Sequence, residues 1–551
     1  AFAMKATEDD AHWLSVAQAS ALIQARELSP VEYVEHLVRR IETFDPQLHS
    51  FITPCFDSAR QRARLAEAEI MAGRSRGPLH GIPFGVKDVY ETADAVTTSG
   101  SRVPYAGARR RDAAIVQRLH AAGALLLGKL ATHEFAHGGP SPELPWPVAR
   151  NPWSTTRFTG GSSSGSAAAV AAGLLPAALG TDTGGSIRGP ASYCGIAGFL
   201  PSAGLVSRAG VVPNSYTLDH CGPMARTVED CALLLQAIAG HDPSDGNSFV
   251  QPIPDYRAGL HAGIEGLRIG VLRHIWEEEL ACSAEHRRAL DETVATLRGL
   301  GARIADARIR SMRDYLDVKI VIGESEIFSV HHRQLIERAG EFGRDFLTRI
   351  LPAVLFQSAD YVAASREQRR MIAQMQALHA RFDVLLLPGF GAAGPISAQR
   401  SLNFWTHANP HAVANLIGAP SLAVCCGFSE AGLPLGVQFM GPPLSDQTVL
   451  RVGHAYERAT DWRSRRPMLT AGATAPALTE PLAATDPSAT DAETRELALR
   501  LAEQAGLRLD DTLQAILFEA APHALAMRRR LPRHDGSVFD EPAHVFRLPE
   551  Q

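Results

Sequence analysis

The sequence predicts an α/β protein in which helices pack on a buried central sheet, and three observations carry this prediction. Short apolar runs at 124–128, 384–388 and 421–425 are typical of strands buried on both faces. Stretches with apolar residues at helical spacing lie before and between them. The chain has 551 residues, 45% hydrophobic and 21% charged, which is enough for a large core and more than one domain.

The first 90 residues predict helices followed by a strand. Residues 15–44 have helical periodicity in two stretches, and Ser29-Pro30 supplies an N-cap and a first-turn proline for the second. A third amphipathic helix is expected at 58–72, and an apolar strand then ends at Lys87, between Val86 and Val89. Lys87 is either a strand-end lysine whose amine reaches the surface, or a desolvated amine that is neutral and acts as a base. Its position alone does not decide between the two.

The next segment contains a literal zinc-motif match that the sequence context does not support. After a helix at 113–122 and the strand at 124–128, the residues His133-Glu134-Phe-Ala-His137 match H-E-x-x-H. A zinc site needs this motif on a regular helix with a third ligand, whereas two glycines and Pro140 follow here at once. We therefore expect a loop that lines a pocket, and no metal.

Two segments rich in glycine and hydroxyl side chains, 159–166 and 180–188, are the strongest candidates for catalytic loops. A helix at 167–172 follows the first segment and directs its free amides toward the hydroxyls. In the second segment, successive amides with little side-chain obstruction are what an oxyanion hole requires; these belong to Thr183, Gly184, Gly185 and Ser186. Taken singly, each segment could also be a glycine-rich turn that caps a helix.

Together these segments resemble the amidase signature family. The motifs that carry the resemblance span most of residues 15–468: GIPFGVKD at 81–88, GGSSSGS at 160–166, GTDTGGSIR at 180–188, DHCGPMAR at 219–226 and GLPLGVQFMG at 432–441. The resemblance implies a central mixed, twisted β-sheet covered on both faces by α-helices. It also implies hydrolysis of a carbon–nitrogen bond beside a carbonyl, without a cofactor.

The resemblance further implies a Ser-cisSer-Lys triad, with Ser186 as nucleophile, Ser162 as bridging serine and Lys87 as base. The spacing of 24 residues between Ser162 and Ser186 agrees with the family and selects Ser162 over its two serine neighbours. Neutral Lys87 would take a proton from Ser162, which takes one from Ser186, and an acyl-enzyme would form. Asp182 and Arg188 are expected to hold the nucleophile loop, although a carboxylate-binding role for Arg188 stays open.

The helical segment 312–380 is expected to cover the catalytic core and to set specificity, as the corresponding half does in related enzymes. Each candidate for lining the pocket could instead be ordinary core; the candidates are Phe135, Gly138, Tyr193, Phe404 and Trp405.

The chain after residue 468 predicts a separate unit. An amidase domain at 4–468 would be followed by a linker rich in Ala, Thr and Pro at 469–490 and by a helical tail at 491–551. The tail has helical stretches at 494–505 and 509–530 and the ending EPAHVFR at 541–547. It resembles the small accessory subunit of carboxybiuret-hydrolase-type amidases, which implies dimerisation.

Composition limits the classes of binding partner and the cellular compartment that we expect for this chain. The formal net charge of −5 gives no electrostatic footprint for nucleic acid or an anionic membrane, and seven cysteines without metal spacing suit a reducing compartment. We expect a cytoplasmic homodimer that acts on a small-molecule amide, carbamate or biuret-like substrate, with no nucleic acid and no membrane. The alternative is an amidotransferase-type subunit that works with partners on a charged transfer RNA.

Overall fold

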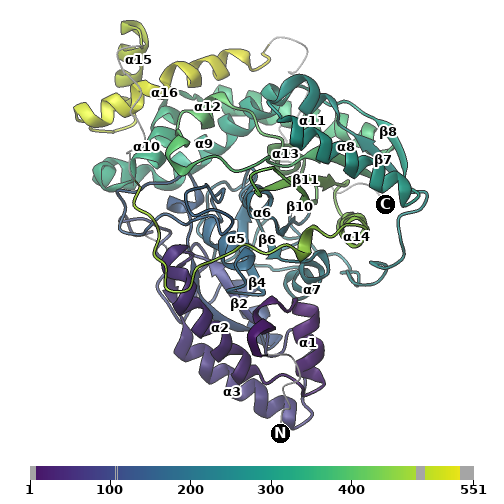
Figure 1. Cartoon of the computed structure of the whole chain (residues 1–551). Coiled ribbons are helices and arrows are strands. Elements are labelled where there is room, and N and C mark those ends of the chain that lie inside the picture. The colour runs from purple at the N-terminus through teal and green to yellow at the C-terminus, as the bar shows by residue number, and fades with distance from the viewer. Residues whose placement is uncertain (1–7, 106, 108, 479–489, 534–551) are drawn as a thin grey trace.

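A computed structural model describes residues 8–105, 107, 109–478 and 490–533 of the chain (Figure 1). Its centre is an 11-stranded mixed sheet flanked by helices, which confirms the predicted fold class. The strands are β1 (Phe51–Pro54), β2 (Pro83–Lys87), β3 (Leu125–Leu130), β4 (Ala177–Asp182), β5 (Ala197–Leu200), β6 (His220–Ala225), β7 (Arg268–Val271), β8 (Arg303–Asp306), β9 (Val384–Pro388), β10 (Ser421–Phe428) and β11 (Pro434–Met440).

The sheet has parallel strands toward both ends and antiparallel strands in the middle. Its order is β1-β3-β2-β4-β6-β5-β10-β11-β9-β7-β8. Strands β3, β2 and β4 run parallel to one another, as do β9, β7 and β8. The carboxyl ends of β2 and β4 therefore lie side by side at one edge, where ligand sites of α/β sheets form.

Helices flank the sheet, with the amino-terminal ones at one end of the molecule and the tail at the other (Figure 1). The α-helices are α1 (Val16–Gln24), α2 (Pro30–Phe44), α3 (Phe56–Met71), α4 (Ala114–Ala121), α5 (Ser164–Ala171), α6 (Arg188–Cys194), α7 (Val228–Ile238), α8 (Ala284–Gly299), α9 (Met312–Arg338), α10 (Arg344–Ile350), α11 (Ser358–His379), α12 (Asn403–Thr406), α13 (Ala412–Ile417), α14 (Asp446–Arg458), α15 (Ala492–Gln504) and α16 (Asp511–Arg530).

A local sequence signal explains where α2 begins, whereas the start of α5 depends on contacts with distant residues. Ser29 Oγ accepts hydrogen bonds from the amides of Val31 and Glu32 at 3.1 and 3.2 Å, so the predicted N-cap of α2 is confirmed. Helix α5 begins at Ser164, three residues before the predicted start at 167. The hydroxyls of Ser164 and Ser166 donate to the carbonyls of Ala131 and Leu179, so the fold holds this polar first turn in the helix.

The two tail helices, α15 and α16, pack against the helical half of the chain. Helix α16 contacts α9, α10 and the 3₁₀ turn Leu351–Leu355, and Arg530 on α16 makes a two-armed ion pair with Asp317 on α9 at 2.6 and 2.8 Å. Residues 541–547, which carry part of the resemblance to an accessory subunit, lie outside the described residues, so that resemblance and the domain division stay predictions. No helix within the described ranges is long and apolar enough to cross a bilayer.

Candidate active site

Strands β2 and β4 bring Lys87 into contact with two hydroxyls. Lys87 is the last residue of β2, and Thr181 lies near the end of the parallel neighbour β4. The ammonium Nζ of Lys87 donates to Ser162 Oγ and to Thr181 Oγ1, each at 2.7 Å. Of the two interpretations of Lys87, the structure shows the buried one, since the side chain is 0% exposed.

Burial lowers the pKa of Lys87 to about 7, although Asp182, Asp219 and Cys221 act in the opposite direction. Neither Asp182 nor Asp219 lies within ion-pair distance of the Lys87 amine, and each has other partners. Asp182 pairs with Arg188, and Asp219 accepts hydrogen bonds from Thr183 Oγ1 at 2.6 Å and the Asn214 amide at 2.8 Å. A substantial fraction of Lys87 is therefore a neutral amine near neutral pH.

Ser162 and Ser186 line one cavity of about 320 Å³. The Gly161–Ser162 peptide bond is cis, as the family resemblance implies. Ser162 Oγ accepts from Lys87 and donates to the carbonyl of Ala136 at 2.8 Å. The Ser163 amide donates to the carbonyl of Ser186 at 3.3 Å, so the two glycine-rich segments touch at the cavity.

The carbonyl of Ala136 reaches Ser162 through an unusual backbone. Phe135 and Ala136 have φ of 50° and 58°, a left-handed conformation that is uncommon for residues with a side chain. Asn214 Nδ2 also donates to this carbonyl, at 2.9 Å. The loop after β3 is thus shaped to present a backbone acceptor to the Ser162 hydroxyl.

The predicted oxyanion amides are not equivalent. The Gly185 amide donates to Asp182 Oδ1 at 2.7 Å and is therefore not free to bind an oxyanion, which corrects the prediction for this residue. Within the part of the chain that the structure describes, the amides of Gly184 and Ser186 have no hydrogen-bond partner and lie at the cavity. These two amides remain the predicted donors, with Thr183 beside them.

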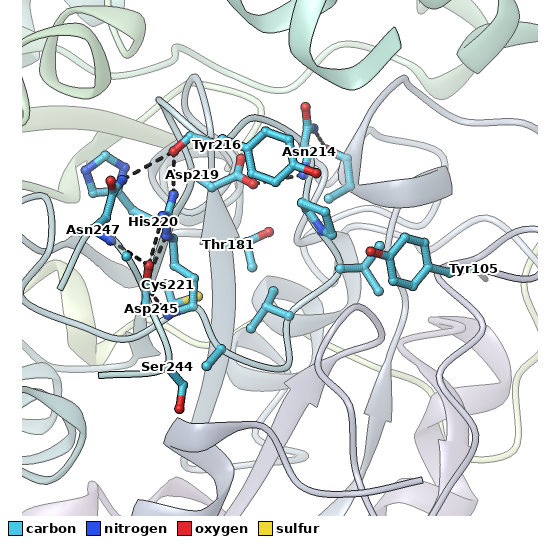
Figure 2. A pocket seen from close by; sticks show the side chains of 17 residues that line it. Tyr105, Thr181, Asn214, Tyr216, Asp219, His220, Cys221, Ser244, Asp245 and Asn247 are labelled. Atoms are coloured by element: carbon cyan, nitrogen blue, oxygen red, sulfur yellow. Dashed lines mark hydrogen bonds and ion pairs between the residues drawn. The ribbon is translucent and has the colours of Figure 1, made fainter. Parts of the chain in front are cut away.

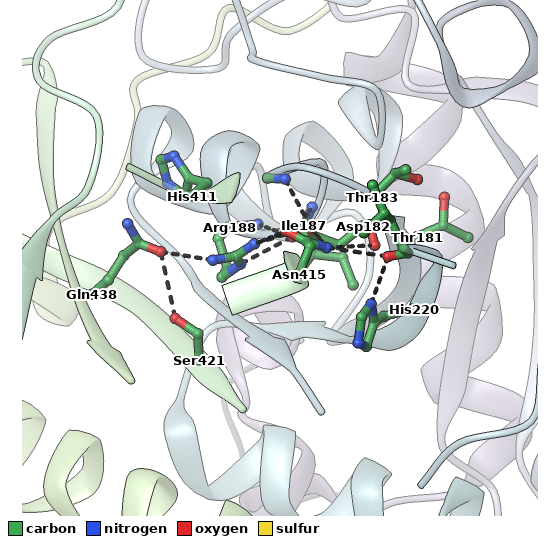
Figure 3. Close-up of polar contacts among 12 residues, drawn as sticks. Thr181, Asp182, Thr183, Ile187, Arg188, His220, His411, Asn415, Ser421 and Gln438 are labelled. Atoms are coloured by element: carbon green, nitrogen blue, oxygen red, sulfur yellow. Dashed lines mark hydrogen bonds and ion pairs between the residues drawn. The ribbon is translucent and has the colours of Figure 1, made fainter. Parts of the chain in front are cut away.

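Asp182 and Arg188 form a buried network beneath the nucleophile loop (Figure 3). Arg188 contacts both oxygens of Asp182 at 3.1 Å and donates to Gln438 and Asn415 at 2.9 and 2.7 Å. Burial raises the pKa of Asp182, but the charge and hydrogen bonds of Arg188 outweigh this and hold the pKa well below its usual range. Arg188 is fully occupied within this network, which favours its predicted structural role over carboxylate binding.

The H-E-x-x-H segment does not form a zinc-binding arrangement. It is a 3₁₀ turn rather than a regular helix, and its side chains have three separate partners. His133 Nδ1 contacts the Gly138 carbonyl at 2.8 Å, Glu134 accepts from Ser101 Oγ at 2.5 Å, and His137 Nε2 contacts Glu324 at 3.0 Å.

The cavity contains three of the five predicted pocket residues. Gly138, Tyr193 and Phe404 line it, and their role in substrate binding stays a prediction. Phe135 is 0% exposed and packs on His331 and phenylalanines of the core, while Trp405 is buried and donates to the Thr348 carbonyl at 3.1 Å. These two residues do not line the cavity, because the turn after β3 and helix α12 direct their rings into the core.

Several residues at the site were not predicted. Thr181 belongs to the second glycine-rich segment and could have been found there as a hydroxyl beside the nucleophile loop. Asn214, Lys319 and Arg349 line the cavity from segments without a local signal. Ala136 and Asn214 also line a second cavity of about 450 Å³, whose other side chains include Thr181 and Asp219 (Figure 2).

Comparison with known proteins identifies the family. The profile described as Amidase matches residues 32–450. The chain is 39% identical over 484 residues to a glutamyl-tRNA(Gln) amidotransferase subunit from Chloroflexus aurantiacus, covering 83% of this chain and 99% of that protein. The peptide amidase of Stenotrophomonas maltophilia superposes with a TM-score of 0.72 at 32% identity, covering 82% of this chain and 98% of that one. A structure described as a vestigial protein complex, related to an s-triazine catabolic enzyme, superposes with a TM-score of 0.75 at 31% identity, covering 81% of this chain and 98% of that one.

These relatives correct one prediction and confirm another. The prediction of a small-molecule substrate with no nucleic acid is wrong, because the curated relatives are named as subunits of an enzyme for glutamyl-tRNA(Gln). The predicted reaction class is confirmed, and the chain is an amidohydrolase that acts on a carbon–nitrogen bond. The chain belongs to the amidase signature family.

Proposed function

We propose that the chain hydrolyses a carboxamide through an acyl-enzyme on Ser186, as the amide-hydrolysing component of an amidotransferase-type assembly that acts on a charged transfer RNA. The observation that carries the chemistry is the 2.7 Å hydrogen bond between the buried Lys87 amine and Ser162 Oγ. A desolvated lysine with a pKa of about 7 is a competent base near neutral pH.

The relay begins at Lys87. The Ser162 hydroxyl turns from the Ala136 carbonyl to neutral Lys87 and gives up its proton while it takes the proton of Ser186. Ser186 Oγ then attacks the amide carbon, and the amides of Gly184 and Ser186 stabilise the oxyanion by about 3 kcal/mol for each well-placed donor. The proton held on Lys87 returns through Ser162 to the leaving nitrogen, which departs as ammonia. A water molecule, activated by the same relay, releases the acyl group.

The role in an assembly is supported by the relatives. The match to the amidotransferase subunit of Chloroflexus aurantiacus covers 99% of that protein and 83% of this chain, so the likeness extends over the whole length of that protein and is not limited to one motif. Ammonia released at Ser186 would then serve as the nitrogen donor for another component, which holds the charged transfer RNA.

The test of the chemistry is ammonia release from a panel of amides. The panel contains aliphatic amides, amino-acid amides, peptide amides, aryl amides, carbamates and biuret-like compounds. We expect Ser186→Ala to lower kcat/KM by about 10³-fold or more on every substrate that the unaltered chain hydrolyses. Ser164→Ala is the matched control, because Ser164 Oγ donates to Ala131 and does not line the cavity. Turnover by Ser186→Ala within threefold of the unaltered chain would overturn the assignment of the nucleophile.

The role in an assembly has its own test. With ¹⁵N-labelled amide, the other components of the assembly and glutamyl-tRNA present, we expect label in the amidated transfer RNA, and none with Ser186→Ala. Hydrolysis by the chain that never labels transfer RNA, with partners that bind, would overturn this role and leave the hydrolytic chemistry in place.

A further inference from the structure

Three arginines from distant parts of the chain meet at the ring of Trp13, beside the amino-terminal helices α1 and α2 (Figure 1). Trp13 ends the 3₁₀ turn Glu8–Trp13, Arg40 lies on α2, Arg226 directly follows β6, and Arg466 lies after α14. Their guanidinium carbons are 5.2, 5.6 and 4.6 Å from the ring centroid, in that order. Each contact with the ring is favourable, but the three positive charges repel one another.

No carboxylate that the structure describes lies within ion-pair distance of these arginines. Burial lowers the pKa of Arg40 to about 10, and the charge of Arg226 acts in the same direction. Burial lowers the pKa of Arg466 to about 10 as well, again with a contribution from Arg226. Burial also lowers the pKa of Arg226, while Tyr33 and Asp230 oppose this change. The cluster therefore carries positive charge that no described acid neutralises by direct contact.

Some hydrogen-bond donors of the cluster are also unused. Arg40 Nη2 donates to the carbonyl of Ala172 at 2.8 Å, and Arg226 Nη2 donates to the carbonyl of Leu14. By contrast, Arg40 Nε and Arg226 Nη1 are buried and have no hydrogen-bond partner within the described ranges, and the same is true of the Tyr33 hydroxyl. Buried donors without a partner cost free energy, which an acceptor at this place would recover.

A cavity of about 600 Å³ adjoins the cluster, and its lining comes from the turn Glu8–Trp13 and from α2. Tyr33 and Arg40 both line it, and its volume is typical of a small-molecule site. His12, which lines it too, reports the potential there. Burial and then the charge of Arg40 lower the pKa of His12 to about 3, and the other two arginines act in the same direction. All three arginines therefore make this cavity electropositive.

Two acids line the same cavity without cancelling this potential. Glu35 makes a two-armed ion pair with Arg60, at 2.7 and 3.1 Å, and Glu32 is exposed to solvent, as is Arg39 beside them. Carboxylates at this position repel the further phosphates of a nucleic acid. A small molecule with a single phosphate group does not meet this repulsion.

We infer that this cavity binds a small molecule through its phosphate group, with Arg40 as the residue that contacts the phosphate. A phosphate supplies acceptors for the unused N–H groups and neutralises clustered arginine charge. Arg226 and Arg466 do not line the cavity and strengthen binding through their charge. The cavity shares no lining residue with the catalytic cavity, so the inference is independent of the proposed function.

Thermal unfolding tests the site with inorganic phosphate, which replaces chloride at constant ionic strength. Because a ligand of the folded chain stabilises it by mass action, Tm should rise as the phosphate concentration passes the dissociation constant. The tryptophan emission should change over the same range. Trp13→Phe keeps an aromatic ring and should lose most of the change in emission while the rise in Tm persists. A Tm that is the same in phosphate and chloride would overturn the inference.

Substitutions identify the residues that bind. Arg40→Met should weaken phosphate binding about tenfold or more, and Arg40→Lys, which keeps the charge, should weaken it less. Arg466→Met should cost about threefold, because that residue acts through its charge alone. Arg64→Met is the matched control, since Arg64 is exposed on α3 and does not line the cavity, and it should bind phosphate normally.

Equal affinities in Arg40→Met and Arg64→Met would contradict the assignment. If Arg40→Met does not fold, Arg40→Lys and Arg466→Met decide it, because affinities equal to that of the unaltered chain in both would overturn the inference. A short single-stranded RNA separates the two sources of phosphate and should bind more weakly than inorganic phosphate. Tighter binding of that RNA, lost in Arg40→Met, would assign the cluster to nucleic acid and overturn a small-molecule site.

Discussion

Two neighbouring strands, β2 and β3, each bury a lysine, and the two lysines have different partners. Lys87 and Lys129 are both 0% exposed. Lys129 Nζ forms an ion pair with Asp88 at 2.7 Å and donates to Thr97 Oγ1 at 2.8 Å. Lys87, next to Asp88 in the chain, contacts hydroxyls alone among the described residues.

This contrast shows how one residue type serves two purposes in one core. A carboxylate at ion-pair distance keeps a buried lysine charged and makes it a structural element. Two hydroxyls satisfy the hydrogen-bonding needs of the amine without fixing its charge, so Lys87 is able to lose and regain a proton. Removal of each lysine should therefore affect different properties.

The largest expected effect is on the activity of a Lys87 variant. Lys87→Met should lower kcat/KM by about 10³-fold or more, because no other group on the relay accepts the proton of Ser162. The free energy of unfolding should change by about 1 kcal/mol or less, since no ion pair is lost. Ammonia release measures kcat/KM, and urea denaturation measures the free energy of unfolding. Activity within tenfold of the unaltered chain would contradict the role of Lys87 as base.

The corresponding change on β3 should give the opposite result. Lys129→Met leaves Asp88 buried and unpaired, which should lower the free energy of unfolding by about 3–5 kcal/mol. Activity per folded molecule should fall far less than in Lys87→Met. The double variant Lys129→Met with Asp88→Asn is the control and should recover part of the stability. Denaturation midpoints that match the unaltered chain would show that the ion pair contributes nothing.

A smaller effect concerns pH. Because neutral Lys87 is the active form and its pKa is about 7, kcat/KM should rise about tenfold per pH unit below pH 7 and level off above it. Thr181→Val removes a hydroxyl that accepts a hydrogen bond from the ammonium, so the pKa should fall and the profile should move to lower pH. A profile displaced to higher pH would mean that Thr181 stabilises the neutral amine instead.

Much of the fold and of the catalytic loops could be predicted from local sequence. Apolar runs located strands such as β9, and the Ser29-Pro30 pair located the start of α2. Lys87, Ser162 and Ser186 were indicated by the resemblance to the amidase signature family, and the spacing of 24 residues only selected Ser162 over its serine neighbours. In the structure Ser162 and Ser186 line one cavity and Lys87 contacts Ser162, while their catalytic roles stay predictions. The site features that could not be predicted depend on contacts between residues that are distant in the chain. The Gly185 amide donates to Asp182, and Lys319 reaches the cavity because α9 places its side chain beside Gly184. An amphipathic pattern at 312–380 predicts helices but does not say which face meets the nucleophile.

The ion pair between Arg530 on α16 and Asp317 on α9 links the tail to the catalytic cavity. Asp317 lies about one half-turn before Lys319 on α9, so the tail and the cavity both contact this helix. Free-energy coupling between two sites is reciprocal. Any free energy by which the docked tail strengthens binding beside Lys319 is therefore also the free energy by which a bound ligand favours the docked tail.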